Sequence, residues 1–282
     1  MKKLISALTF TILMCFGAAA FAQIGSQPPV IQPGKPVTPL SKNLHRGMAF
    51  EVLLSNFGFG VGGQYRQVIS PMTELTADLR ITGLKNVSEQ TISTYFGQET
   101  PHKFNRVLAF PFSVGIRHRI FAKLLDDNFR VHLAAAIGPS MAFVYPYFKD
   151  YNQNGVRDYG NMYLMNGTYY PIPYTGTIPA GGVYQSYEPV NDMFSDWKDG
   201  HLKWGTSGQL VLSVDLGKFK NIGSINVGYY FHYYPGGIQM LEPKNFVLTG
   251  SQTSSSYVIQ PANAPQKYFG SPIISFSFGG MW

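Results

Sequence analysis

The chain ends in Phe269-Gly-Ser-Pro-Ile-Ile-Ser-Phe-Ser-Phe-Gly-Gly-Met-Trp282, and this stretch decides the fold. Successive side chains of a β-strand point to opposite faces, so Ile274, Phe276 and Phe278 share one face. The other face carries Ile273, Ser275, Ser277 and Gly279. An apolar face outward and a small, polar face inward are typical of a strand that crosses a membrane as part of a β-barrel.

The N-terminus predicts export. Met1-Lys-Lys3 is a short basic segment, Leu4 to Phe16 is apolar, and Ala20-Phe21-Ala22 fits a cleavage site. We therefore expect residues 1–22 to be a cleaved signal peptide. The single cysteine, Cys15, lies within it, so the mature chain has no thiol or disulfide chemistry. Two lysines leave with the signal, the formal charge falls from +7 to +5, and no long basic run remains, so nucleic-acid binding is not expected.

The mature chain predicts a leader followed by strands. Residues 23–45 are rich in proline and lack periodicity, which predicts a disordered periplasmic leader. Residues 46–282 repeat with a period of two, which favours strands over helices. Eight strands are predicted, at about 47–55, 59–69, 73–84, 104–120, 129–146, 202–216, 223–235 and the C-terminal stretch. The third is the clearest, with Leu75, Ala77, Leu79 and Ile81 alternating with Glu74, Thr76, Asp78, Arg80 and Thr82.

The connections between these strands alternate in length. Short periplasmic turns are predicted at 70–72, 121–128 and 217–222, and long extracellular loops at 85–103, 147–201 and 236–268, with 56–58 as one short outer connection. An even number of strands with short inner turns and long outer loops is typical of bacterial outer-membrane barrels. The predicted fold is therefore all-β, an eight-stranded antiparallel transmembrane β-barrel. The alternative is a soluble sandwich or lipocalin-like barrel, whose apolar residues face inward.

The terminal Trp282 supports the same class. A last strand that ends in an aromatic residue resembles the signal that the barrel-assembly machinery recognises on bacterial outer-membrane proteins. The mature chain is similar to this broad outer-membrane β-barrel superfamily. The resemblance implies an integral location in the outer membrane, contact with its lipids, and the assembly machinery as a partner during biogenesis. Because members serve as anchors, adhesins, small pores or lipid enzymes, it does not fix the function.

The predicted inward faces carry many charges. They are Glu51, Arg66, Asp78, Arg80, Arg117, Arg130, His132 and Asp215. The interior of an eight-stranded barrel is just wide enough for its own side chains, and charges held away from water must be paired. We therefore expect an ion-pair network that fills the lumen. A narrow ion path is the alternative.

Signals for catalysis are weak. The six histidines show no Ser–His or His–acid spacing on a single strand. A lipase elbow, a zinc-binding H-x-x-x-H and a phosphate-binding loop are absent from the sequence. We expect a non-enzymatic protein without a catalytic residue. The alternative is a lipid-modifying enzyme, for which the position of His232 relative to any serine or acid is decisive.

One motif in the predicted outer loop has the pattern of a metal site. Asp150-Tyr-Asn-Gln-Asn-Gly-Val-Arg-Asp158 places oxygen ligands at positions one, three, five, seven and nine, with glycine at six for the sharp turn. The predicted calcium ligands are Asp150, Asn152, Asn154, Val156 through its carbonyl, and Asp158. The motif resembles the EF-hand-like loops of dockerins and of bacterial adhesin repeats. Position twelve is Asn161 rather than glutamate, which predicts weak binding, and the alternative is an ordinary polar turn.

The rest of the large loop, about 159–200, is rich in Tyr, Gly and Pro. Such a surface suits contact with an extracellular protein or glycan, and it suits equally a loop packed on itself. The sequence therefore favours a structural or surface-interaction component whose extracellular loops carry its contacts.

Overall fold

The computed structural model describes residues 36–282, apart from 95–96, 159, 161, 173–177, 185–187 and 252–253. The chain divides into two compact units, Met1–Pro36 and Val37–Trp282, and every described strand belongs to the second. The predicted signal peptide and residues 23–35 of the predicted leader lie outside the described residues. Among the described residues, no helix is long and apolar enough to cross a membrane.

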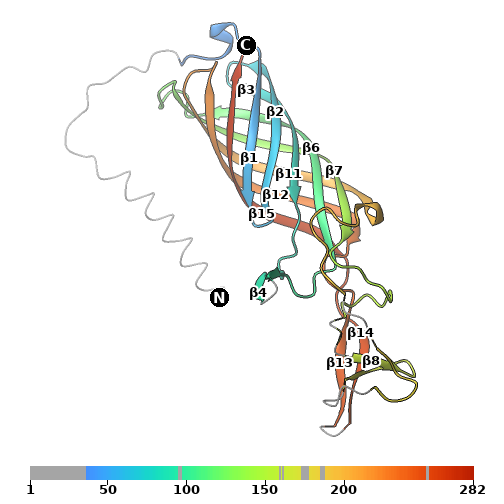
Figure 1. The fold of residues 1–282 in the computed structure, drawn as a ribbon. Coiled ribbons are helices and arrows are strands. Elements are labelled where there is room, and N and C mark those ends of the chain that lie inside the picture. Colours follow the sequence, from blue (N-terminus) through green and yellow to red (C-terminus); the bar gives the residue numbers. More distant parts are fainter. Residues whose placement is uncertain are drawn as a thin grey trace, which may run out of the picture. The chain divides into compact units, whose positions relative to one another are not determined.

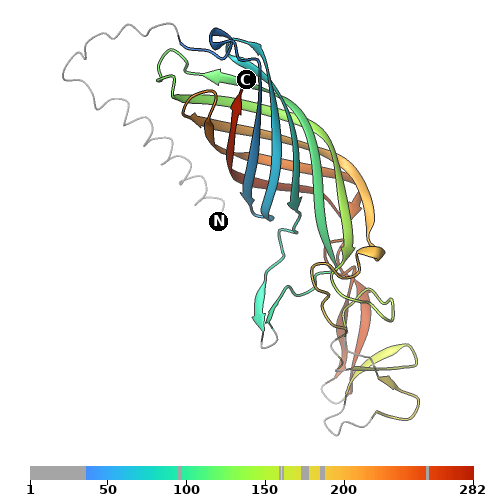
Figure 2. The same ribbon diagram turned by 45° about the horizontal axis from the view of Figure 1, so that its top comes forward.

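Eight long strands form a closed antiparallel barrel (Figure 1). They are β1 (Arg46–Ser55), β2 (Gly58–Ser70), β3 (Thr73–Gly83), β6 (Asn105–Ile120), β7 (Phe129–Pro146), β11 (His201–Leu216), β12 (Ile222–Ile238) and β15 (Gln266–Met281). Their order around the barrel is β1, β15, β12, β11, β7, β6, β3 and β2, and β1 pairs with β15 to close it. Every predicted strand is present with ends shifted by a few residues at most, so the predicted eight-stranded barrel is confirmed. Figure 2 shows the tilted strands of the barrel wall from a second direction.

The two faces of the barrel wall are inverted relative to those of a soluble protein. On β3 the side chain of Leu79 is 56% exposed and that of its neighbour Asp78 is 1% exposed. The same alternation on β15 exposes Phe276 and Phe278 and buries Ser275 and Ser277. A continuous apolar belt on the outside is stable against lipid rather than water. The soluble alternative, which requires the apolar residues inside, is therefore wrong.

The connections divide the barrel into two ends. The end with the short connections between β2 and β3, β6 and β7, and β11 and β12 also carries Trp282, and we name it the turn end. The backbone oxygen of Trp282 accepts hydrogen bonds from the amides of His45 and Arg46, both at 3.0 Å. The opposite end carries the long connections, and we name it the loop end. This division matches the predicted pattern of short and long connections.

Residues 37–45 cover part of the turn end, so the prediction that the disordered leader extends to residue 45 is wrong for this segment. The amide of Val37 donates to Oδ2 of Asp127 at 2.9 Å. A short 3₁₀ turn, η1 (Leu40–Lys42), follows and turns the chain toward β1. Leu44 is buried in a cluster with Val68, Ile222 and Met281. The proline-rich composition predicted disorder, but the apolar side chains of the segment find a surface at the barrel end that offsets the entropy of ordering.

A second sheet, which we name the outer sheet, forms from the loop-end connections. Its strands in order are β10 (Val183–Tyr184), β8 (Met162–Met165), β9 (Thr168–Pro171), β14 (Ser254–Pro261) and β13 (Lys244–Ser251). The first three belong to the connection between β7 and β11, and the last two to the connection between β12 and β15. The two parts meet where Tyr257 pairs with Tyr169, whose ring lies 4.9 Å from that of Phe246. A further hairpin, β4 (Ile92–Thr94) with β5 (Gly97–Glu99), forms in the connection between β3 and β6.

Candidate functional site

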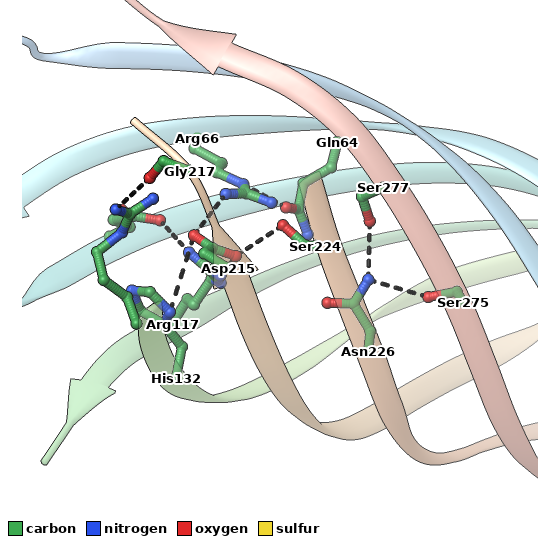
Figure 3. A network of polar contacts seen from close by, with 12 residues as sticks. Gln64, Arg66, Arg117, His132, Asp215, Gly217, Ser224, Asn226, Ser275 and Ser277 are labelled. Carbon is green, nitrogen blue, oxygen red and sulfur yellow. Dashed lines mark hydrogen bonds and ion pairs between the residues drawn. The ribbon is translucent and has the colours of Figure 1, made fainter. Parts of the chain in front are cut away.

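The lumen near the turn end contains a cluster of charges around Asp215 (Figure 3). Arg117, fully enclosed, donates from Nη1 to Oε2 of Glu74 at 3.0 Å and from Nη2 to Oδ1 of Asp215 at 2.5 Å. Asp215 also faces Nη1 of Arg66 at 3.5 Å and accepts a hydrogen bond from the hydroxyl of Ser224 at 2.6 Å. One carboxylate on β11 thus holds arginines from β2 and β6.

A second cluster lies further toward the loop end. Arg80 donates from Nε to Oε2 of Glu51 at 2.6 Å, and its Nη2 lies 3.6 Å from Oδ1 of Asp78. Gln209 accepts a hydrogen bond from Arg80 and donates to Oδ2 of Asp78 at 3.2 Å. This cluster joins β1 and β3 to β11 across the interior.

Gln64 connects the two clusters into one network. Its Nε2 donates to Asp78 at 2.7 Å, and its Oε1 accepts from Nε of Arg66 at 2.5 Å. Ser275 extends the network to β15 by donating to Glu51 at 2.5 Å, and Nδ1 of His132 on β7 lies 3.9 Å from Asp215. Seven of the eight barrel strands therefore contribute a hydrogen-bonded or ion-paired side chain, and His132 of β7 lies beside the network without a hydrogen bond from its Nδ1 to a described residue. The network sets Arg66, Arg80 and Arg117 against Glu51, Glu74, Asp78 and Asp215.

The predicted ion-pair network is thus present, with two differences. His132 lies 3.9 Å from Asp215, but its Nδ1 has no hydrogen-bond partner among the described residues. Arg130 faces inward as predicted, but its Nη1 donates to the carbonyl oxygens of Asp127 and Gly217, at 2.5 and 2.7 Å. Its guanidinium also lies 4.3 Å from the ring centre of Phe219. Since it sits at the turn end, backbone carbonyls and an aromatic face stabilise this cation in place of a carboxylate.

The cavity beside the second cluster is small. A cavity lined by residues that include Arg80, Thr82, Gln209 and Tyr230 has a volume of about 10 Å³. This volume is room for roughly one water molecule. Side chains that reach across the barrel line this cavity, as expected for an interior of this strand number.

The structure brings Ser140 and His232 together, which no spacing on a single strand could predict. They lie on β7 and β12, with Oγ of Ser140 3.2 Å from Nδ1 of His232 and 2.8 Å from the hydroxyl of Tyr234. Ser140 is 0% and His232 1% exposed. Among the described residues, no carboxylate forms an ion pair with His232. A serine nucleophile needs an oriented base and access for a substrate, so this arrangement favours a role in packing.

The predicted calcium residues lie in a tight loop. Asp150 accepts the amides of Asn154 at 3.1 Å and Gly155 at 2.8 Å. Oδ1 of Asn152 accepts the amide of Asn154 at 3.1 Å, and Oδ1 of Asn154 accepts the amide of Val156 at 2.7 Å. Gly155 has a φ of +78°, a conformation that side chains other than glycine rarely adopt. The loop therefore turns as the motif predicts, while Asn161, the predicted twelfth position, lies outside the described residues.

The carboxylates around this loop are held in an unusual environment. Burial raises the pKa of Asp158 to about 6, and the nearby charge of Asp150 acts in the same direction. Burial also raises the pKa of Glu188 to about 7, with the charges of Asp158 and Asp150 adding to the effect. Within the described part of the chain, no group of three or more His, Cys, Asp or Glu side chains is arranged to hold a metal. The oxygens of the predicted loop come from two carboxylates, two amides and one carbonyl.

A closed antiparallel barrel with an apolar belt outside and a charged lumen defines the class of transmembrane β-barrels. No protein-family model matches the sequence, and no curated protein matches it.

Three similar solved structures are outer-membrane proteins. The N-terminal β-barrel domain of Pseudomonas aeruginosa OprF is 8% identical over 84% of this chain and 98% of its own, with a TM-score of 0.31. A major outer membrane protein from Thermus thermophilus is 8% identical over 83% and 99%, with a TM-score of 0.36. The outer membrane protease OmpT from Escherichia coli is 10% identical over 85% and 93%, with a TM-score of 0.31. Identities this low do not transfer an activity, so the function has to rest on the residues of this chain.

Proposed function

We propose that the protein is an integral outer-membrane barrel that neither catalyses a reaction nor conducts ions, and that supports a surface-interaction module at its loop end. The polar network that joins side chains of seven of the eight strands is the observation that carries this proposal. It joins opposite walls of the barrel, and the cavity beside Arg80 has room for roughly one water molecule. Such a lumen suits a rigid support better than a path for solutes.

The orientation in the membrane follows from the two ends. The turn end faces the periplasm, because short turns and both termini lie on that side in bacterial barrels. The loop end then faces the exterior, and the apolar belt contacts the lipids of the outer membrane. The predicted signal peptide and the assembly machinery that recognises the terminal strand complete this route of export.

The outer sheet is the candidate surface for a partner. Val183 and Tyr184 of β10 are exposed at one edge of the sheet, and Leu248 and Val258 are exposed on β13 and β14. Exposed aromatic and aliphatic side chains on a small sheet suit contact with an extracellular protein or a glycan. Loops positioned by a rigid scaffold commonly carry binding functions.

Conductance in planar bilayers tests the closed lumen. We expect no current steps from the unmodified barrel. Glu51→Ser combined with Arg80→Ser removes two long side chains from the second cluster and should open a small conductance. Leu79→Ala, which changes only the lipid face of the same strand, should remain silent. Stable steps from the unmodified protein would contradict a closed lumen and favour the narrow channel.

Surface capture tests the interaction module. Replacing residues 162–184 by a flexible linker removes β8, β9 and β10 while leaving the barrel strands intact. Intact cells should lose retention of the extracellular protein or glycan that the unmodified chain retains, and heat-modifiable migration on gels should show an assembled barrel in both. Ser140→Ala should leave membrane lipid composition unchanged. A change in lipids with this variant would instead support the lipid-modifying enzyme.

A further inference from the structure

The three long connections at the loop end, which we name the outer connections, meet at the loop that contains Asp150 to Asp158. Oε1 of Glu242, from the connection between β12 and β15, accepts the amide of Arg157 at 3.0 Å. Oε2 of the same carboxylate lies 2.9 Å from Nδ1 of His102, from the connection between β3 and β6. The backbone amide of Glu242 also donates to the carbonyl of His102 at 2.8 Å. Glu242 therefore connects residues 150–158 to both of the other connections.

The two ends of the large connection also meet here. Glu188 holds the loop by accepting the amide of Tyr151 at 2.7 Å through Oε1 and that of Asp158 at 2.9 Å through Oε2. Its own amide donates to the carbonyl of Asp158 at 2.9 Å. Just before the loop, Phe148 forms a β-bridge with Val190. One carboxylate thus fixes the second and ninth positions of the motif, which brings its first and last ligands toward each other.

The buried carboxylate of Asp158 points to a bound cation. The residue is 1% exposed, and its Oδ2 accepts a hydrogen bond from Nδ2 of Asn152 at 2.6 Å. Its Oδ1 is enclosed and has no hydrogen-bond partner among the described residues. A buried carboxylate oxygen without a partner is costly, because it has lost water and gained nothing in exchange. Among the described ion pairs, none involves Asp150, Asp158 or Glu188.

We propose that residues 150–158 bind a calcium ion through side-chain oxygens of Asp150, Asn152, Asn154 and Asp158 and the carbonyl of Val156, and that the bound ion locks the junction of the three outer connections. Hard oxygen ligands of this kind are those that calcium prefers. The oxygens of Asp150 and Asn154 that accept loop amides each have a second lone pair that an ion can use. The loop is therefore shaped before the ion arrives.

Glu188 closes the loop, as the glutamate at position twelve does in a complete motif. It does not have to touch the ion, because its two hydrogen bonds already close the loop around the ligands. It acts as a positioning residue, and its charge adds to the negative potential that attracts a divalent cation. With only two carboxylates in contact with the ion, the dissociation constant should be on the order of 0.1–1 mM, the range of extracellular modules.

Titration of the folded, full-length barrel with CaCl₂ tests the proposal through two measurements. The first is terbium luminescence sensitised by tyrosine, since Tyr169 accepts a hydrogen bond from Asn154 at 3.2 Å, followed by competition with calcium. The second is external proteolysis of residues 147–200 in calcium or in chelator. We expect saturable displacement of terbium and slower cleavage in calcium, with MgCl₂ much less effective because magnesium demands a smaller, octahedral site.

Variants assign the effect to named residues. Asp158→Asn should weaken calcium binding at least tenfold and abolish the calcium-dependent protection, whereas Asp199→Asn, an exposed acid elsewhere in the same connection, should change neither. Glu188→Gln should retain binding with a several-fold weaker affinity, as a positioning role requires. Heat-modifiable migration shows that each variant has assembled. The proposal is overturned by the absence of saturable binding, by equal effects of magnesium, or by unchanged affinity in assembled Asp158→Asn protein.

Discussion

Asp215→Asn tests whether the lumen network holds the barrel together. The substitution keeps the size of the side chain and removes the charge that faces Arg66 and Arg117. Breaking one partner of a buried ion pair typically costs about 3–5 kcal/mol, because a charge is left buried and uncompensated. Arg117 keeps Glu74 at 3.0 Å, and Arg66 keeps its hydrogen bond to the amide oxygen of Gln64. The loss should therefore lie at the lower end, about 3 kcal/mol, which is roughly a hundredfold in the unfolding equilibrium.

Urea unfolding in lipid vesicles, followed by tryptophan fluorescence, measures this loss. Asp199→Asn serves as the matched control, since it makes the same chemical change on an exposed turn, and it should stay within about 0.5 kcal/mol of the unmodified protein. Adding Arg66→Gln to Asp215→Asn removes the stranded cation and should restore part of the stability, which a double-mutant cycle quantifies. If Asp215→Asn unfolds like the control, the network contributes little and the argument for a reinforced lumen fails.

Three further outcomes follow from the same structure. Leu79→Arg, in the middle of the lipid face, should lower the free energy of unfolding by about 2–4 kcal/mol in the same vesicle assay. Ile69→Arg, near the turn end, should lower it by about 0–1 kcal/mol. Equal losses would contradict the membrane position of the apolar belt. Deleting Trp282 should lower the amount of assembled, heat-modifiable barrel without lowering synthesis, whereas Trp282→Phe should assemble normally; a truncated chain that assembles fully would refute a role for the terminal aromatic residue. The pKa values of Glu188 and Asp158 are raised in the folded protein, so the folded outer loops bind more protons than the unfolded ones between about pH 4 and pH 7. The stability of these loops therefore falls as the pH rises through this range. In chelator, external proteolysis should therefore be faster at pH 8 than at pH 5, and a rate independent of pH would show that these acids are not strained.

The barrel could be predicted from the sequence because its physics is local. The alternation of side chains along β3 places Leu79 outside and Asp78 inside, whichever strands pair with it. The apolar face must contact lipid and the polar face must face the lumen. The existence of an ion-pair network follows from the same alternation. Its connectivity does not, since the role of Gln64 as a bridge depends on the register between strands.

The outer connections were less predictable because their structure depends on contacts between distant segments. The outer sheet forms when a strand near Tyr169 meets one near Tyr257, and β8, β9 and β10 are too short to show a pattern by themselves. The pairing of Ser140 with His232 likewise needs two strands that are separated in the barrel by β11. The motif at 150–158 was visible in the sequence, but the distant Glu188 that closes it was not.

The lumen network and the junction around residues 150–158 differ in whether their carboxylates are paired with cations. This difference determines which part of the protein should respond to calcium and pH. In the lumen the carboxylates of the network are paired with arginines and amides, so we expect calcium and pH to have little effect on them. At the outer junction, Asp158 and Glu188 are as deeply buried, yet they are held by backbone and amide groups without a paired cation among the described residues. A divalent ion or a proton can bring positive charge to these carboxylates. Changes in calcium and pH should therefore alter the proteolysis of residues 147–200 and leave the heat-modifiable migration of the barrel unchanged, and a barrel that loses its assembly in chelator would contradict this division.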